Sequence, residues 1–143
     1  MAKYEFSEQQ LLQMARRAET ELNQRQAILE RLNAAMREAG AAEDALKELE
    51  KNEGTIMVRL GSGIIIEAET GKIKKCRRPF SENGYLEETT EDTLKWLAKR
   101  KEEIRKQSEK IEQEITTAAK NLSDLMSILN QIQAEKRKNF SRQ

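Results

Sequence analysis

Residues that could carry out chemistry are scarce in this sequence. Its 143 residues include no histidine, which removes the commonest general base and metal ligand. The single cysteine, Cys76, has no histidine to activate it, and one thiol can form neither an intrachain disulfide nor a multi-thiolate zinc site. No phosphate-binding loop of the Walker type is present. We therefore expect no enzyme, no catalytic residues, no metal site and no cofactor, and we interpret Cys76 as a half-buried thiol on a strand.

A basic run near the middle of the chain is the strongest candidate for a ligand site. Five positive charges within residues 72–78 are enough to suggest a nucleic-acid patch. Glutamates flank the run on both sides, and no aromatic side chains alternate with it for base stacking. A solvated or ion-paired edge strand is the favoured interpretation, and a nucleic-acid-binding hairpin stays open as an alternative. The basic residues are Lys72, Lys74, Lys75, Arg77 and Arg78.

The composition limits the elements that can position these residues. Only 37% of the residues are hydrophobic and 36% are charged, whereas average soluble domains have about 45–50% and 25%. Aromatic residues make up 4%, and the chain has 6 glycines and 1 proline. These values exclude a sandwich or a doubly wound α/β enzyme, because such folds need a thick two-sided core. They suit long, solvated helices.

Two segments have the apolar spacing of coiled-coil helices. The first is predicted over residues 7–51, with Ser7 and Gln10 forming a capping box, and the second over 90–138, with Thr89 and Thr90 as candidate N-caps. The similar lengths and the short insert between them predict an antiparallel hairpin. The seams comprise Leu11, Ala15, Ala18, Leu22, Leu29, Leu32, Met36, Ala39 and Leu46, and Leu94, Leu97, Ile104, Ile111, Ile115, Ala118, Leu122, Leu125, Leu129 and Ile132.

A few polar residues interrupt these seams, and we interpret them as setting the register. In the first seam they are Arg25 and Glu43, and in the second they are Lys101 and Ser108. Pairing the seams from either end brings Glu43 opposite Lys101. The sequence therefore predicts an ion pair between them.

The insert, residues 55–88, has the composition of β-strands. Two β-branched runs surround Gly61-Ser62-Gly63, which predicts a hairpin. A second, weaker pair of strands follows, interrupted by Pro79 and joined by a type I′ turn at Asn83-Gly84. Four short strands with apolar faces and no helix across them should pair with strands of other chains. The expected oligomerisation residues are Ile56, Val58, Leu60, Ile64 and Ile66.

The predicted fold class is thus α+β: a long antiparallel two-helix coiled-coil hairpin with a small β-hairpin insert that oligomerises into a β platform. Helix, two β-hairpins, helix, with a Gly-small-Gly turn in the first hairpin, resembles the prefoldin subunits of the α type. The most telling stretch is residues 55–69 with its Gly61-Ser62-Gly63 turn. The second hairpin departs from the family pattern, because a basic segment with Pro79 stands where a glycine-rich turn is usual. The resemblance covers nearly all of 1–143, which we expect to be one domain.

The resemblance implies an ATP-independent holdase. It implies assembly with β-type prefoldin subunits into a hexamer, binding of unfolded client proteins at the coiled-coil tips, and delivery to a group II chaperonin. Apolar residues near the tips and outside the seams are the candidate client-binding set, although scattered surface apolar residues are also normal in soluble proteins. These residues are Leu12, Met14, Met126, Ile128 and Phe140.

Two features of the sequence bear on the location of the protein in the cell. No apolar run reaches the length of a membrane span, and the first ten residues lack the apolar core of a signal peptide, so we expect a cytoplasmic protein without membrane contact.

Two other function classes stay open beside the holdase. A coiled-coil scaffold that assembles through its strands with one defined partner is the first alternative. The nucleic-acid-binding hairpin, which is less favoured, is the second.

Overall fold

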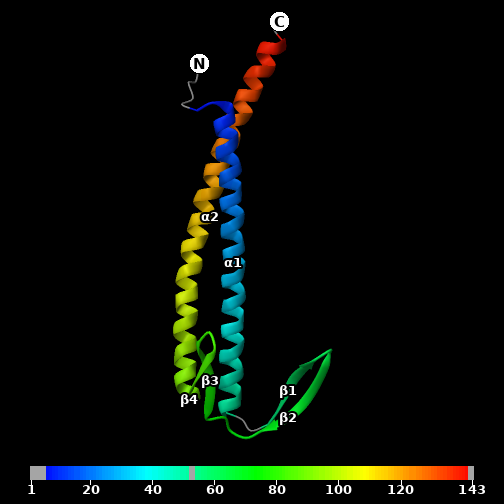
Figure 1. Ribbon diagram of the computed structural model, residues 1–143, viewed down its shortest axis with the longest axis vertical. Helices are drawn as coiled ribbons and strands as arrows, with labels where there is room; N and C mark the ends of the chain where they lie inside the picture. Colours follow the sequence, from blue (N-terminus) through cyan, green and yellow to red (C-terminus); the bar gives the residue numbers. More distant parts are fainter. Residues whose placement is uncertain (1–5, 52–53, 142–143) are drawn as a thin grey trace. The chain divides into compact units, whose positions relative to one another are not determined.

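A computed structural model of the chain describes residues 6–51 and 54–141. Along the chain, one long helix is followed by four strands and then by a second long helix, which confirms the predicted fold class (Figure 1). Over the described residues, neither helix has an apolar stretch long enough to cross a bilayer. The elements are α1 (Glu8–Lys51), β1 (Gly54–Gly61), β2 (Ile64–Thr70), β3 (Lys75–Ser81), β4 (Gly84–Thr89) and α2 (Thr90–Ser141).

Both helices begin at the caps that the sequence predicts. The Gln10 amide donates to Ser7 Oγ at 3.2 Å, and the Ser7 amide donates to Gln10 Oε1 at 2.9 Å, which completes the capping box. At the start of α2, the Asp92 amide donates to Thr89 Oγ1 at 3.2 Å. Each cap satisfies amides that have no partner within the first turn of a helix. The second helix runs to Ser141, a little beyond the predicted end at 138.

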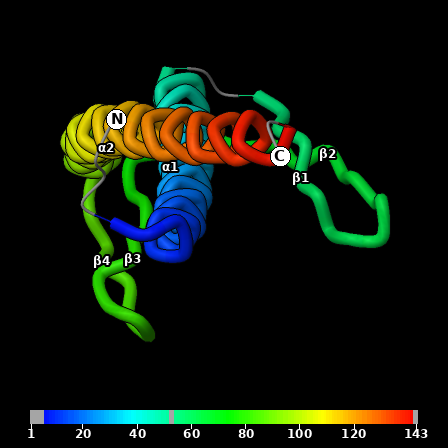
Figure 2. Tube along the Cα trace, turned by 90° about the horizontal axis from the view of Figure 1, so that it is seen from above, coloured from blue at the N-terminus to red at the C-terminus, as the bar shows by residue number. Residues whose placement is uncertain are grey.

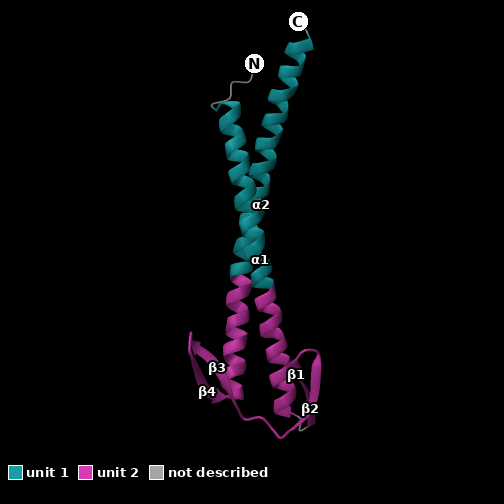
Figure 3. Ribbon diagram, turned by 45° about the vertical axis from the view of Figure 1, so that its right-hand side comes forward, with its two compact units in different colours: residues 1–33, 107–143 teal, residues 34–106 magenta. Residues whose placement is uncertain are grey.

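The contacts divide the chain into two compact units (Figure 3). One unit contains residues 1–33 and 107–143, and the other contains residues 34–106. A single domain over 1–143 therefore stays a prediction. In the first unit, Leu11, Ala15 and Leu129 are buried together, and Leu122, Leu125, Ile128 and Ile132 pack against them. In the second unit, the buried apolar side chains are Ala39, Leu97 and Ile104. All six of these buried apolar residues lie at predicted seam positions.

The first hairpin, β1–β2, has the predicted strands and turn. Its antiparallel register pairs Val58 with Ile66 and Ile56 with Ala68, and an irregularity between Arg59 and Gly61 precedes the turn. Gly61, Ser62 and Gly63 have φ values of 106°, 51° and 77°. Three consecutive residues in the left-handed region explain the two glycines, because a side chain is strained there.

The second hairpin, β3–β4, corrects two predictions. Pro79 does not interrupt the strand: it lies inside β3, opposite Tyr85, where an edge strand can accommodate a residue without an amide hydrogen. The type I′ turn at Asn83-Gly84 is also wrong. Gly84 opens β4, and among the described residues neither Asn83 nor Gly84 has a positive φ. A Cβ at Gly84 would lie 2.8 Å from Ser81 Oγ, so a larger residue there would need the Ser81 side chain to move away.

The two hairpins form separate two-stranded sheets (Figure 2). The connection between them, residues 71–74, is tied to the start of α2 by the buried Thr90. The Thr90 amide donates to the Lys74 carbonyl at 3.1 Å, and its hydroxyl donates to the Ile73 carbonyl at 3.3 Å. Because each sheet has only two strands, neither of its outer edges pairs with a third strand among the described residues.

Candidate functional site

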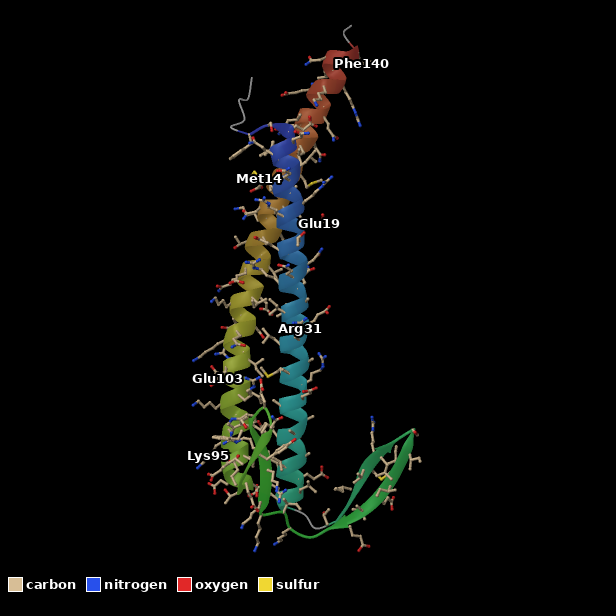
Figure 4. The ribbon with its side chains drawn as sticks, in the orientation of Figure 1. Met14, Glu19, Arg31, Lys95, Glu103 and Phe140 are labelled. Atoms are coloured by element: carbon tan, nitrogen blue, oxygen red, sulfur yellow. The ribbon has the colours of Figure 1, made fainter. Side chains whose placement is uncertain are left out.

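The apolar residues predicted at the helix ends are mostly exposed. Leu12, Met14 and Met126 are 41%, 37% and 46% exposed, and Phe140 is 83% exposed. Met14 and Phe140 lie toward the first turns of α1 and at the end of α2 (Figure 4). The fifth residue, Ile128, differs, because it is partly buried against the Leu11 core. We call the four exposed residues the distal apolar set.

The distal apolar set flanks the seam rather than forming one continuous face. At 100° per residue, Leu12 and Met14 lie on opposite sides of the line through Leu11 and Ala15. A shallow groove of about 440 Å³ runs beside Met14, lined also by Arg17, Glu21, Asp124 and Leu125. The sequence analysis missed this groove, because spacing along each helix does not show what lies between two helices. The set can therefore offer apolar contact on either side of the helix pair.

The strand residues predicted to mediate oligomerisation share one face of β1–β2. Ile56 and Val58 are half-buried, and Leu60, Ile64 and Ile66 are 59%, 56% and 43% exposed. Their side chains alternate with Met57, Glu67 and Glu69 on the other face. This is an apolar surface of the kind that marks an interaction site when it is left open.

The basic run does not behave as one patch. Arg78 forms a bidentate ion pair with Glu88: Nε donates to Oε1 at 2.7 Å and Nη2 to Oε2 at 3.4 Å. The guanidinium also stacks over Trp96, with 5.0 Å between Cζ and the ring centroid. Arg78 is therefore engaged in packing β3–β4 on α2, which confirms the ion-paired interpretation at this residue and weakens the nucleic-acid reading.

Further hydrogen bonds extend this ion pair. The Cys76 thiol donates to Thr93 Oγ1 at 2.8 Å, and the Thr93 hydroxyl donates to Glu88 Oε1 at 2.8 Å. Hydrogen bonds from Arg78 and then Thr93 hold the pKa of the Glu88 carboxyl below its ordinary value of 4.5, against the opposing effect of burial. Cys76 is half-buried, as predicted. We call Cys76, Arg78, Glu88, Thr93 and Trp96 the Arg78 cluster.

The sequence analysis missed the Arg78 cluster as a unit. Its members come from β3, β4 and α2, and Thr93 and Trp96 were assigned no role. A signal was present, because Cys76 and Arg78 alternate on one face of a strand, and Thr93 and Trp96 are three residues apart on one side of a helix. Over the described residues, no group of three or more metal-ligating side chains occurs.

Polar seam residues form ion pairs between the two helices, and one of these pairs was predicted. Lys101 Nζ lies 3.5 Å from Glu43 Oε2, which confirms that pair, and Lys47 Nζ lies 2.9 Å from Glu43 Oε1. The hydrogen bond from Lys47 and the charge of Lys101 lower the pKa of Glu43. In the other unit, Arg25 Nε contacts Glu114 at 3.2 Å. Each unit therefore has its own polar contact between α1 and α2.

Comparisons with known proteins agree with this architecture. Residues 18–135 match the Prefoldin family, described as prefoldin subunit. No curated protein matches the chain. Among solved structures, the chain is similar to filamentous PFD from Methanocaldococcus jannaschii, determined by cryo-EM, with a TM-score of 0.64 and 24% identity over 78% of this chain and 94% of that chain. The family match covers most of the sequence, and the structural match supports the fold. The chain therefore belongs to the prefoldin family, as a coiled-coil subunit of chaperone type.

Proposed function

We propose that this subunit is an ATP-independent holdase. In this proposal the distal apolar set binds non-native protein, and the strands join the subunit to other prefoldin subunits. The observation that carries the proposal is the exposure of Leu12, Met14, Met126 and Phe140 beside a seam that is already closed by Leu11, Ala15 and Leu129. Since that core is complete without them, their apolar surface is available to a partner.

The chemistry of the distal apolar set fits varied clients. Two of its four members are methionines, whose unbranched, polarisable side chains adapt to differently shaped apolar partners. The remaining two are a leucine and a phenylalanine, which supply larger apolar contact. Holding a client in this way is a binding equilibrium and requires no nucleotide.

The wider assembly follows from the family. We propose that β-type prefoldin subunits pair with this chain to give a hexamer, and that the clients pass to a group II chaperonin. We propose a cytoplasmic location, where the lone Cys76 would stay reduced. Ile56, Val58, Leu60, Ile64 and Ile66 are the proposed strand contacts in that assembly.

The test is suppression of client aggregation without nucleotide. A variant with Leu12→Ser, Met14→Ser, Met126→Ser and Phe140→Ser should lose most of its protection of several unrelated denatured proteins, measured by light scattering. Ile28→Ser is the matched control, because Ile28 is 40% exposed on α1 but lies outside the set. Full protection by the fourfold variant, or equal loss in the control, would refute the proposed binding surface.

Substitution tests the distal apolar set more specifically than truncation of the helix ends does. Deleting residues 1–14 and 126–143 should also abolish protection. That deletion, however, removes Leu11 and Leu129, two of the three buried residues of the local core. The serine variants leave this core intact, so circular dichroism and assembly size should match those of the unaltered chain.

A further inference from the structure

The groove beside Met14 combines apolar and polar side chains from both helices. All of its lining residues lie in the first compact unit. Its apolar surface comes from Met14, Ala18 and Leu125. Met14 also belongs to the distal apolar set, so the groove is continuous with the proposed client-binding surface. The polar side chains of the lining are Arg17 and Glu21 of α1 and Asn121 and Asp124 of α2.

Three of the four polar side chains in this lining have no partner among the described residues. Arg17, Asn121 and Asp124 form neither a side-chain hydrogen bond nor an ion pair there. Glu21 differs, because its Oε2 lies 3.7 Å from Nη1 of Arg25. The groove thus offers a guanidinium, a carboxylate and an amide that are all available to a ligand beside apolar surface.

Arg17 and Asp124 lie at about the same level of the helix pair. Two ion pairs between the helices bracket that level, namely Glu8–Lys136 nearer the helix ends and Arg25–Glu114 farther from them. Because α1 and α2 run in opposite directions, a position between Glu8 and Arg25 faces one between Lys136 and Glu114. The two opposite charges therefore stand on opposite sides of one groove, and they do not pair with each other.

An extended polypeptide presents the groups that complement these walls. Its backbone N–H and C=O groups point sideways, while its side chains alternate between two faces. A chain that runs along the groove can turn carbonyl oxygens toward Arg17, amide hydrogens toward Asp124 and every second side chain toward the apolar lining. The α1 side of the lining spans seven residues from Met14 to Glu21, or about 10 Å, which is the length of about three extended residues.

We propose that this groove binds the backbone of an extended apolar client segment, with Arg17 donating to a carbonyl oxygen and Asp124 accepting from an amide. The inference rests on the proposed holdase function and names the chemical class of ligand that the site takes. Folded proteins pair nearly all of their buried backbone groups, whereas a non-native chain leaves such groups open. Backbone contacts to charged side chains therefore select the non-native state and are independent of client sequence.

The test uses the full chain and two matched peptides. The first is a short uncharged peptide of leucine, serine and glycine with blocked termini and a fluorescent label. The second has the same sequence with every backbone amide N-methylated, which removes the amide donors and keeps the side chains and the charge. Fluorescence anisotropy should give a dissociation constant about fivefold higher for the N-methylated peptide.

Arg17→Met and Asp124→Ala are the informative variants, and both positions are exposed and outside the local core. Each should raise the dissociation constant of the unmodified peptide about fivefold, with unchanged circular dichroism. In Asp124→Ala the difference between the two peptides should largely disappear, because the acceptor for the amide is gone. In Arg17→Met that difference should persist. Arg16→Met and Glu19→Ala, at exposed positions outside the lining, should change nothing.

Three outcomes would overturn the inference. They are equal binding of the two peptides by the unaltered chain, a difference between the peptides that survives in Asp124→Ala, and binding that appears only after a lysine and a glutamate are added to the peptide. The last result would mean that Arg17 and Asp124 hold client side chains instead of the backbone.

The outcomes also separate this inference from the proposed function. If clients are protected through the distal apolar set but the two peptides bind alike, only the backbone contacts are wrong. If Asp124 distinguishes the peptides but no client is protected, only the holdase function is wrong.

Discussion

The two hairpins of this chain have nearly the same construction and opposite surroundings. Each is antiparallel, with an irregularity just before its turn. In β1–β2 the face with Ile64 and Ile66 is apolar and exposed. In β3–β4 the corresponding face holds Cys76, Arg78 and Glu88, which contact Thr93 and Trp96 of α2. A charged strand face fastens β3–β4 to its own helix, whereas the apolar face of β1–β2 is left exposed.

The largest expected effect comes from placing charge on the exposed apolar face. Ile64→Lys with Ile66→Lys should weaken assembly by roughly a hundredfold or more, because two isoleucines that the proposed assembly would bury are replaced by ammonium groups that must stay hydrated. Native mass spectrometry, with and without a β-type subunit, should show dimers or monomers.

The control for that variant lies on the second hairpin. Tyr85→Lys alters a residue that is 72% exposed on the β3–β4 hairpin and should leave assembly unchanged. Equal disruption by both changes would show that the two hairpins do not differ in the way described here.

A smaller effect is expected from acid on the second hairpin. The pKa of Glu88 is lowered in the folded chain, so its ion pair contributes fully above the ordinary value of 4.5 and is lost as the pH falls below it. Trp96 is the one tryptophan in the sequence and lies under Arg78, so its fluorescence should change below about pH 4.5.

The matched variant for this titration is Glu88→Gln. It removes the titrating group, so the fluorescence of Trp96 should already resemble the acid form at neutral pH and should change little on acidification. An unaltered acid transition in that variant would mean that another carboxyl controls the attachment of β3–β4. Glu43 and Glu102, whose pKa values are also lowered, are then the residues to test.

The smallest effect concerns the seam rather than the hairpins. In a double-mutant cycle, Glu43→Ala and Lys101→Ala should be less than additive, with a coupling below about fivefold in the unfolding equilibrium constant that shrinks in high salt. Lys47→Ala is included because Lys47 also binds Glu43. Strict additivity would indicate that the pair does not help to set the register.

Much of the fold could be predicted because it depends on local patterns. The three- and four-residue spacing of the seams places Leu11, Ala39 and Ile104 in the core, and the caps follow from a few neighbouring residues. The turn at Gly61-Ser62-Gly63 was equally local. In the second hairpin, the same reasoning wrongly predicted that Pro79 would interrupt the strand and that Asn83-Gly84 would form a type I′ turn. An edge strand can accommodate a proline, and Gly84 opens β4 without a positive φ.

The candidate sites were less predictable, because they join distant residues. The exposure of Leu12, Met14 and Met126 follows from their positions outside the seam. Ile128 also lies outside the seam but packs against the core, which spacing alone does not show. The Arg78 cluster combines strands and a helix, so no short motif contains it.

Hydrogen exchange of the two hairpins tests the central difference most directly. Mass spectrometry on the dissociated chain, obtained by dilution or with the Ile64→Lys and Ile66→Lys variant, should show rapid exchange in β1–β2 and slower exchange in β3–β4. On assembly of the unaltered chain, β1–β2 should become protected. Equal protection of both hairpins in the dissociated chain, or no change in β1–β2 on assembly, would contradict the account.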